Sequence, residues 1–138
     1  MRMITKGGAP LYQVSQPVME DDSVGLLIDE MFKTMVEHRG VGLAANQVGV
    51  TKRVIVVLVG GLKLSLINPV ITKRYGGKSG QVEECLSFPG GEAMMIRHNK
   101  IIVEGLDRNR KPVRRKLKGL AARCVQHEVD HLNGVTIL

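Results

Sequence analysis

The sequence predicts an α+β fold, in which short, mostly antiparallel strands pack around one helix near the C-terminus and a second, amphipathic helix lies nearer the N-terminus. Two observations support this prediction. Apolar residues recur at helical spacing near both ends of the chain, and the segments between are short, β-branched and separated by glycine. The chain has 138 residues, 43% of them apolar, which is enough for one domain with a modest core.

The first predicted helix follows residues 21–23 (Asp-Asp-Ser), whose side chains are suited to cap its N-terminus. Apolar residues then recur every three or four positions, at Val24, Leu27, Ile28, Met31 and Met35. We expect this helix to end before Gly40.

Residues 54–59 and 64–71 are rich in branched apolar side chains and are predicted to form a hairpin of two strands. Pro69 cannot donate a ladder hydrogen bond, so we expect a bulge or an edge position there. Residues 76–80 (Gly-Gly-Lys-Ser-Gly) predict a flexible loop. Further strands are expected around residues 83–88, 93–98, 101–106 and 113–117, and a second helix from about Gly119 to Asn133-Gly134.

The net charge of +7 suggests anionic partners or surroundings, and its source is one segment. Residues 108–118 hold seven of the 20 basic residues and no acidic one, so 13 basic residues balance 13 acidic residues elsewhere. This run is interpreted first as a solvated hairpin and second as a surface that meets phosphate.

The longest unbroken apolar run, residues 54–59, is too short to cross a bilayer, and the N-terminus lacks the apolar stretch of a secretion signal. We therefore expect a soluble, cytoplasmic protein with no membrane partner. Cys85 and Cys124 are then expected to be free thiols or a metal ligand rather than a disulfide.

The segment His127-Glu128-Val129-Asp130-His131 predicts metal chemistry, because histidines four apart on a helix can hold one ion. Glu128 would lie near the ion and could act as a general base or acid. Cys124 is about 10 Å along the helix axis from His131, too far to share the ion. Cys85 lies on another segment, and we predict that it completes a site suited to Zn(II) or Fe(II).

Residues 40–47 (Gly-Val-Gly-Leu-Ala-Ala-Asn-Gln) have too little bulk for ordinary core. They could form a tight connection from helix to strand. They could equally form a site wall whose backbone pairs with an extended ligand and whose Gln47 amide donates to an oxygen. The composition favours neither alternative.

Residues 40–47, 83–87 (Glu-Glu-Cys-Leu-Ser) and 127–134 together resemble the three signature motifs of the peptide deformylase family, in the family's order. The resemblance implies a catalytic domain over residues 1–138, a metallohydrolase that removes the formyl group from formyl-methionine at the N-terminus of nascent polypeptides and releases formate. Only seven residues follow His131, whereas many bacterial members continue into a helix that contacts the ribosome. The chain is in this respect similar to short deformylases encoded by bacteriophages.

The resemblance also assigns roles to residues. Cys85, His127 and His131 would bind one divalent metal, natively Fe(II) and replaceable by Zn(II), Ni(II) or Co(II). The Gln47 amide and the Leu86 backbone N–H would stabilise the oxyanion, and Glu128 would carry a proton to the leaving amine. The methionine pocket and peptide groove would be lined by Val41, Gly42, Leu120, Arg123 and Cys124.

Two positions depart from the family pattern. Glu84 stands where the family usually has glycine, which places a carboxylate beside the groove, and Arg123 stands where an apolar pocket residue is common. We expect these two charges to compensate each other. We also expect Arg97 to pair with Glu83 and so to hold the strand that carries Cys85.

Two other functions use similar residues. A zinc peptidase with the same helix would take a further His or Glu ligand after His131, and the seven following residues contain neither. A basic nucleic-acid-binding module with a structural metal would need four protein ligands, but three are evident. The expected partners are formyl-methionyl nascent peptides and, through residues 108–118, the ribosome; we expect a monomer.

Overall fold

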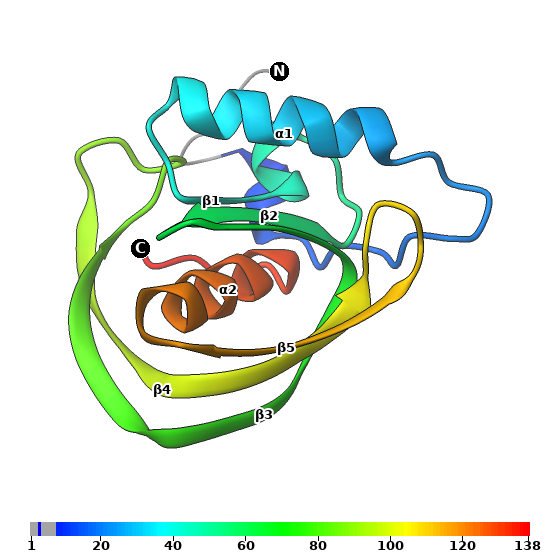
Figure 1. Ribbon diagram of the computed structural model, residues 1–138. Coiled ribbons are helices and arrows are strands. Elements are labelled where there is room, and N and C mark those ends of the chain that lie inside the picture. Colours follow the sequence, from blue (N-terminus) through cyan, green and yellow to red (C-terminus); the bar gives the residue numbers. More distant parts are fainter. Residues whose placement is uncertain (1–2, 4–7) are drawn as a thin grey trace.

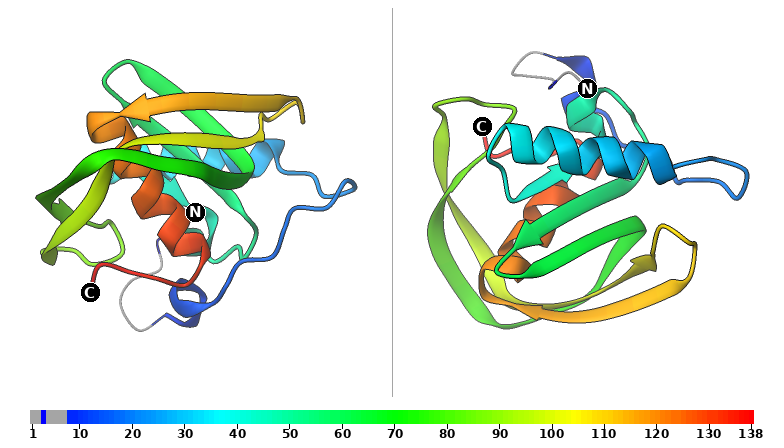
Figure 2. Two further views of the ribbon diagram at one scale, coloured as in Figure 1. Left: turned by 90° about the horizontal axis from the view of Figure 1, so that it is seen from below. Right: turned by 45° about the horizontal axis from the view of Figure 1, so that its top comes forward.

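The computed structural model describes residue 3 and residues 8–138. In this part of the chain, five strands form one antiparallel sheet in the order β1-β2-β3-β4-β5, which curls around helix α2, while helix α1 covers its other side (Figures 1 and 2). The strands are β1 (Gly42–Ala44), β2 (Val54–Val59), β3 (Leu62–Glu84), β4 (Glu92–Leu106) and β5 (Pro112–Lys118). The helices are α1 (Gly25–Glu37) and α2 (Gly119–Leu132), with short 3-10 helices η1 (Ala9–Tyr12) and η2 (Ala45–Val48). The predicted α+β class is confirmed.

Helix α1 is confirmed, but its predicted cap is wrong. The N-cap residue is Val24, and no side chain caps the helix. The Asp22 carboxylate instead accepts a hydrogen bond from the Met19 backbone N–H at 2.8 Å and pairs with Lys52 at 3.2 Å. A local turn thus competes with the cap for this side chain.

The hairpin of β2 and β3 is confirmed, and the pairing register shifts between Ile67 and Val70, as the proline predicted. The predicted loop at residues 76–80 is wrong, because this segment continues β3. Gly76 and Gly77 adopt positive φ angles of 77° and 75° at the register shift between Tyr75 and Lys78. A Cβ atom on Gly76 would lie 2.9 Å from the Lys100 Cγ, so glycine permits a bulge there rather than a loop.

The separate strands predicted at residues 93–98 and 101–106 are one continuous strand, β4. His98 pairs with Lys78 of β3, and Lys100 pairs with both β3 and β5. These backbone pairings keep the strand continuous through the polar residues 98–100. The strand predicted at residues 83–88 ends at Glu84, so Cys85 lies in the loop that follows β3. Strand β5 and helix α2 are confirmed close to their predicted bounds.

Two apolar clusters lie on opposite sides of the sheet. One joins the sheet to α2 and includes Ile55, Val57, Leu66, Ile101, Val103, Val125 and Val129. The other joins the sheet to α1 and includes Ile28, Met31, Met35, Val54, Val56 and Ile67. Alternate residues of β2 enter each cluster, which explains why this strand is apolar without interruption. No helix in the described residues is both long enough and apolar enough to span a membrane.

Candidate active site

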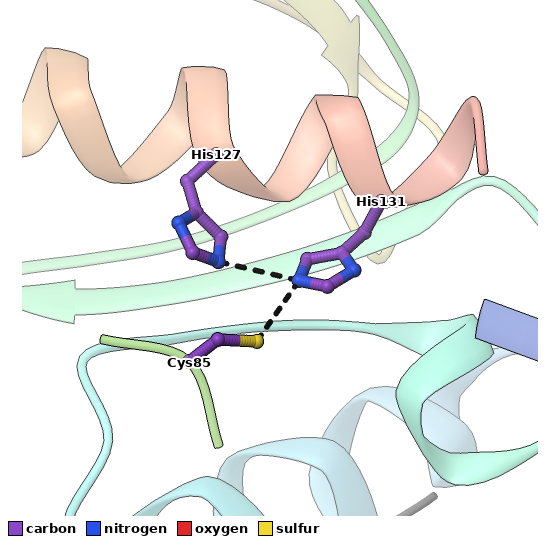
Figure 3. Close-up of side chains that lie close together, drawn as sticks. All are labelled: Cys85, His127 and His131. Carbon is purple, nitrogen blue, oxygen red and sulfur yellow. Dashed lines mark hydrogen bonds between the residues drawn. The ribbon is translucent and has the colours of Figure 1, made fainter. Parts of the chain in front are cut away.

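Helix α2 and the loop after β3 bring Cys85, His127 and His131 together (Figure 3). The histidines lie one helical turn apart, and their Nε2 atoms are 3.2 Å from each other. The Cys85 Sγ lies 3.2 Å from the His131 Nε2. One potential ligand atom from each of the three residues lies within 4.8 Å of the other two.

The donor set fits a metal ion. All three side chains are buried, and the His127 Nδ1 lies 2.9 Å from the Glu83 Oε1, an arrangement that keeps a proton on Nδ1 and directs Nε2 toward the cluster. A thiolate and two imidazoles suit Zn(II) or Fe(II), and three protein ligands leave a coordination position open. Cys124 is outside the cluster; burial, aided by Glu128, raises the pKa of its thiol to about 12, so it remains protonated.

The two imidazoles differ in their affinity for a proton. Burial opposes charge on His127, but Glu128, Cys85 and Glu83 outweigh it and raise the pKa of His127 to about 10. Burial, with the neighbouring His127, lowers the pKa of His131 to about 3. A metal ion binding at neutral pH would therefore displace a proton from His127.

Glu83 connects the cluster to its surroundings. Its carboxylate accepts hydrogen bonds from Arg97 at 2.7 and 2.9 Å and from Arg123 at 2.7 Å, besides its contact with His127. Burial would raise the pKa of this carboxyl, but the bonds from His127, Arg97 and Arg123 outweigh that effect and lower it to about 2. The predicted pair of Arg97 with Glu83 is confirmed.

The predicted compensation between Arg123 and Glu84 is wrong. The Arg123 guanidinium binds Glu83 and also donates to the backbone oxygens of Met95 at 3.0 Å and Ser79 at 2.7 Å. Successive side chains of a strand point to opposite faces, so α2 meets Glu83 and not Glu84. Glu84 is exposed and forms no ion pair with any described residue.

Glu128 lies beside the cluster with its carboxylate buried. Its Oε1 has no hydrogen-bond partner among the described residues. A Cβ atom at Gly42 would lie 2.6 Å from its Oε2, so glycine in β1 makes room for the carboxylate. Burial, partly opposed by His127, raises the pKa of Glu128 to about 7. The carboxyl can therefore gain or lose a proton near neutral pH.

Two further donors lie near the cluster. The Gln47 Oε1 accepts a hydrogen bond from the Ala44 backbone N–H at 2.9 Å, which turns the Nε2 toward the Cys85 Sγ at 3.5 Å and the Ser87 Oγ at 3.2 Å. The Leu86 backbone N–H donates to no group in the described part of the chain. Residues 40–47 therefore combine both alternatives left open by the sequence, a tight connection and one wall of the site.

A cavity of about 790 Å³ opens beside the cluster. Every residue predicted for the substrate pocket lines it: Val41, Gly42, Glu84, Leu120, Arg123 and Cys124. His38 and Arg39 also line it, and no motif of the sequence indicated them. Their only signal is their position directly before the glycine-rich segment.

A curled antiparallel sheet surrounds a helix whose two histidines meet Cys85, and the Glu128 Oε1 beside them has no hydrogen-bond partner in the described part of the chain. These features define a metal-dependent hydrolase. The sequence model of one family matches residues 1–138. The chain belongs to the polypeptide deformylase family.

Relatives of known identity carry the same name. The peptide deformylase of Pelotomaculum thermopropionicum is 52% identical over 112 residues, covering 81% of this chain and 72% of the relative. The peptide deformylase of Halothermothrix orenii is 48% identical over 140 residues, covering 98% of this chain and 90% of the relative.

Solved structures agree with the fold. The crystal structure of PDF from the Vibrio parahaemolyticus bacteriophage VP16T in complex with actinonin has a TM-score of 0.96 at 42% identity, covering 99% of this chain and 100% of that one. Peptide deformylase from Thermotoga maritima has a TM-score of 0.94 at 38% identity, covering 99% and 93%. The protein is thus an enzyme that removes the N-formyl group from formyl-methionine of nascent polypeptides and releases formate. The zinc-peptidase and nucleic-acid-module interpretations are replaced by this activity.

Proposed function

We propose that Cys85, His127 and His131 hold the single divalent metal of this deformylase, natively Fe(II), with Zn(II), Ni(II) or Co(II) as replacements. The observation that carries this proposal is the convergence of their ligand atoms within 4.8 Å beside the unpartnered Oε1 of Glu128. When bound, the metal would polarise the formyl carbonyl and make water a stronger nucleophile at neutral pH.

The surrounding residues supply the remaining chemistry. The Gln47 Nε2 and the Leu86 backbone N–H would donate hydrogen bonds to the formyl oxygen as it gains negative charge. Glu128 would take a proton from the attacking water and deliver it to the leaving amine. Its buried carboxyl, with a pKa near 7, suits both transfers.

The cavity would hold the start of the peptide. Val41, Gly42, Leu120 and Cys124 offer it small or apolar groups for the methionine side chain. The Arg123 guanidinium is engaged by Glu83 and two backbone oxygens, so its contribution to the pocket would be structural rather than a free charge. Glu84 would meet the residues after methionine.

The test is formate release from formyl-Met-Ala-Ser by anaerobically purified enzyme, compared with Glu128→Gln. The substitution keeps the shape of the side chain but replaces the carboxylate by an amide that cannot take up and deliver a proton, so we expect kcat/KM to fall by about 10²- to 10⁴-fold with metal content unchanged. Glu104→Gln, on the exposed part of β4, is the matched control and is expected to retain full activity. A fully active Glu128→Gln enzyme would refute the role of Glu128.

Beyond the chemistry, we propose that residues 1–138 form one catalytic domain that acts as a cytoplasmic monomer in bacteria or phage-infected bacteria. The sharing of β2 between both apolar clusters supports a single domain. Sedimentation at several concentrations of the enzyme would reveal any self-association.

We further propose that the basic segment 108–118 brings the enzyme to the ribosome by neutralising phosphate. Its net positive charge supports the proposal. Reversing the charges of Arg114 and Arg115 is expected to weaken co-sedimentation with ribosomes at low salt. Unchanged co-sedimentation would refute this route.

A further inference from the structure

The register of β3, β4 and β5 gathers lysines that lie far apart in the sequence. Directly paired residues share a face of the sheet, so Lys73, Ile102 and Lys116 form one row across the three strands. Tyr75, Lys100 and Lys118 form the adjacent row. These two rows, called here the lysine face, lie on the side of the sheet opposite α2, because Ile101 and Val103 of the same strand pack on that helix.

The charge of the lysine face is not neutralised within the described part of the fold. The ammonium groups of Lys73 and Lys100 lie 4.8 Å and 6.0 Å from the centroid of the Tyr75 ring, a contact that leaves both charges in place. None of its four lysines forms an ion pair with a described residue. Lys100 lies directly opposite Lys118, a like-charge pair that opposes sheet formation. Glu104, the acidic residue in the next row, lies 3.7 Å from Arg114 instead.

The structure also divides the basic segment 108–118 by role. Arg108 binds Asp29 of α1 through two hydrogen bonds of 2.6 and 3.2 Å, and Arg110 donates to the Asp22 backbone oxygen. These arginines attach the β4–β5 turn to the α1 side of the molecule. Only Lys116 and Lys118 of the basic segment belong to the lysine face. Its other two lysines, Lys73 and Lys100, lie in β3 and β4, outside the segment.

The chemistry of the face favours phosphate. Lysine ammonium groups act as compact point charges, and no Asn, Gln or Arg fork lies within the two rows to read base edges. The one aliphatic side chain of the rows, Ile102, is 7% exposed, which leaves little to insert into a lipid surface. The exposed apolar residues Met94 and Ile96 lie nearer the start of β4, separated from the two rows by the register shift between Tyr75 and Lys78. Figure 1 shows β3 and β4 curving around α2.

We propose that the lysine face binds the phosphate backbone of double-helical RNA without reading its sequence. This proposal rests on the proposed function, because the ribosome is where the enzyme would meet RNA. The surface that it names includes only part of the basic segment 108–118. With four lysines engaged, the logarithm of affinity should fall with the logarithm of salt concentration with a slope of about −3 to −4.

The experiment measures binding of metal-loaded enzyme to a fluorescein-labelled RNA duplex of about 20 base pairs, by anisotropy between about 50 and 200 mM salt. Lys100→Glu/Lys118→Glu is expected to weaken binding at least about tenfold and to reduce the salt slope by about 2. Lys33→Glu/Lys63→Glu makes the same charge change in α1 and at the start of β3, outside the two rows, and is expected to weaken binding by less than about threefold. The milder Lys73→Gln/Lys116→Gln should also reduce the slope by about 2.

Three results would overturn the proposal: no RNA binding at the lowest salt, equal losses in the lysine-face and control variants, or stronger binding to vesicles of phosphatidylcholine and phosphatidylglycerol than to RNA. Thermal unfolding of each variant checks that the sheet is intact. Formate release from formyl-Met-Ala-Ser is expected to stay unchanged in all of them. Co-sedimentation of the Arg114 and Arg115 charge-reversal variant with ribosomes tests the proposed encounter separately, and formate release tests the proposed chemistry. A failure of RNA binding by the lysine face is therefore distinguishable from a failure of either of those proposals.

Discussion

Glu83 shows how one buried carboxylate can stabilise a site without taking part in its chemistry. Glu83 lies two residues before Cys85, near the end of β3, and its side chain points toward α2. Arg97, Arg123 and His127 all contact its carboxylate there. Buried carboxylates are costly unless charged groups and hydrogen bonds surround them. The pair with Arg97 was predictable from the sequence. The contacts with Arg123 and His127 were not, because they depend on how α2 crosses the strand.

We predict that Glu83→Gln lowers the free energy of unfolding at pH 7 by on the order of 3 kcal/mol, because Arg123 loses its buried counter-charge and Arg97 keeps only the partly exposed Asp130, at 2.8 Å. The folded-state pKa of about 2 lies below the ordinary value of 4.5, so ionisation stabilises the fold above about pH 5, and this stabilisation disappears as the pH falls toward 2. Guanidinium unfolding of the metal-free proteins should show the difference from wild type shrinking below about pH 4. A difference that stays constant from pH 7 to 3 would contradict this account.

Glu84 is predicted to select substrates by charge, since its exposed carboxylate lines the cavity and pairs with no charged group of residues 8–138. The ratio of kcat/KM for formyl-Met-Lys-Lys to that for formyl-Met-Glu-Glu should exceed one in the wild type and fall by about threefold to tenfold in Glu84→Gln. Glu92→Gln is the matched control, because Glu92 pairs with Glu84 across the strands but lies outside the cavity lining. Equal ratios in Glu84→Gln and wild type would exclude charge selection by this residue.

At the scale of the element, β1 depends on a glycine to approach α2. Gly42→Ala would place a methyl group 2.6 Å from the Glu128 Oε2, and the carboxylate would have to move. We predict a fall in kcat of about 10²-fold with a small change in melting temperature, since a displaced catalytic group costs far more rate than stability. Gly25→Ala is the control, because its added methyl would meet only the Arg108 side chain at 3.5 Å. If both variants lose rate equally, proximity to Glu128 is not the cause.

Elements with strong periodicity were predictable, and those shaped by their neighbours were not. The spacing of apolar residues identified α1 and α2 because each has one buried side. Residues 76–80 have the composition of a loop, yet they continue β3 because β4 offers an uninterrupted partner strand. For the site, the histidine spacing and the exclusion of Cys124 correctly indicated Cys85 as the third member of the cluster. His38 and Arg39 could not be predicted, because only the turn after α1 brings them to the cavity.

At the scale of the whole molecule, the single sheet couples the two apolar clusters, and we predict that they unfold together. Ile28→Ala, on the α1 side, and Leu66→Ala, on the α2 side, remove fully buried side chains and should each lower the free energy of unfolding by about 2–5 kcal/mol. Methyl NMR signals from both clusters should disappear at the same denaturant concentration in each variant. Earlier loss of one cluster would show that the two sides are independent units.

The position of α2 after all five strands determines the order in which the molecule can be assembled. Synthesis runs from the N-terminus, so the apolar residues of the concave side of the sheet, including Ile55 and Val103, are made before the helix that covers them. Contacts such as that of the Asn46 Nδ2 with the His131 oxygen join residues 85 positions apart and form late. Until α2 packs on the sheet, the partly synthesised chain exposes apolar side chains. Such exposed apolar surface makes a chain prone to aggregation, which chaperones prevent. The histidine pair on α2 is synthesised after all five strands, so during synthesis the three proposed metal ligands are present together only once every strand residue has been made.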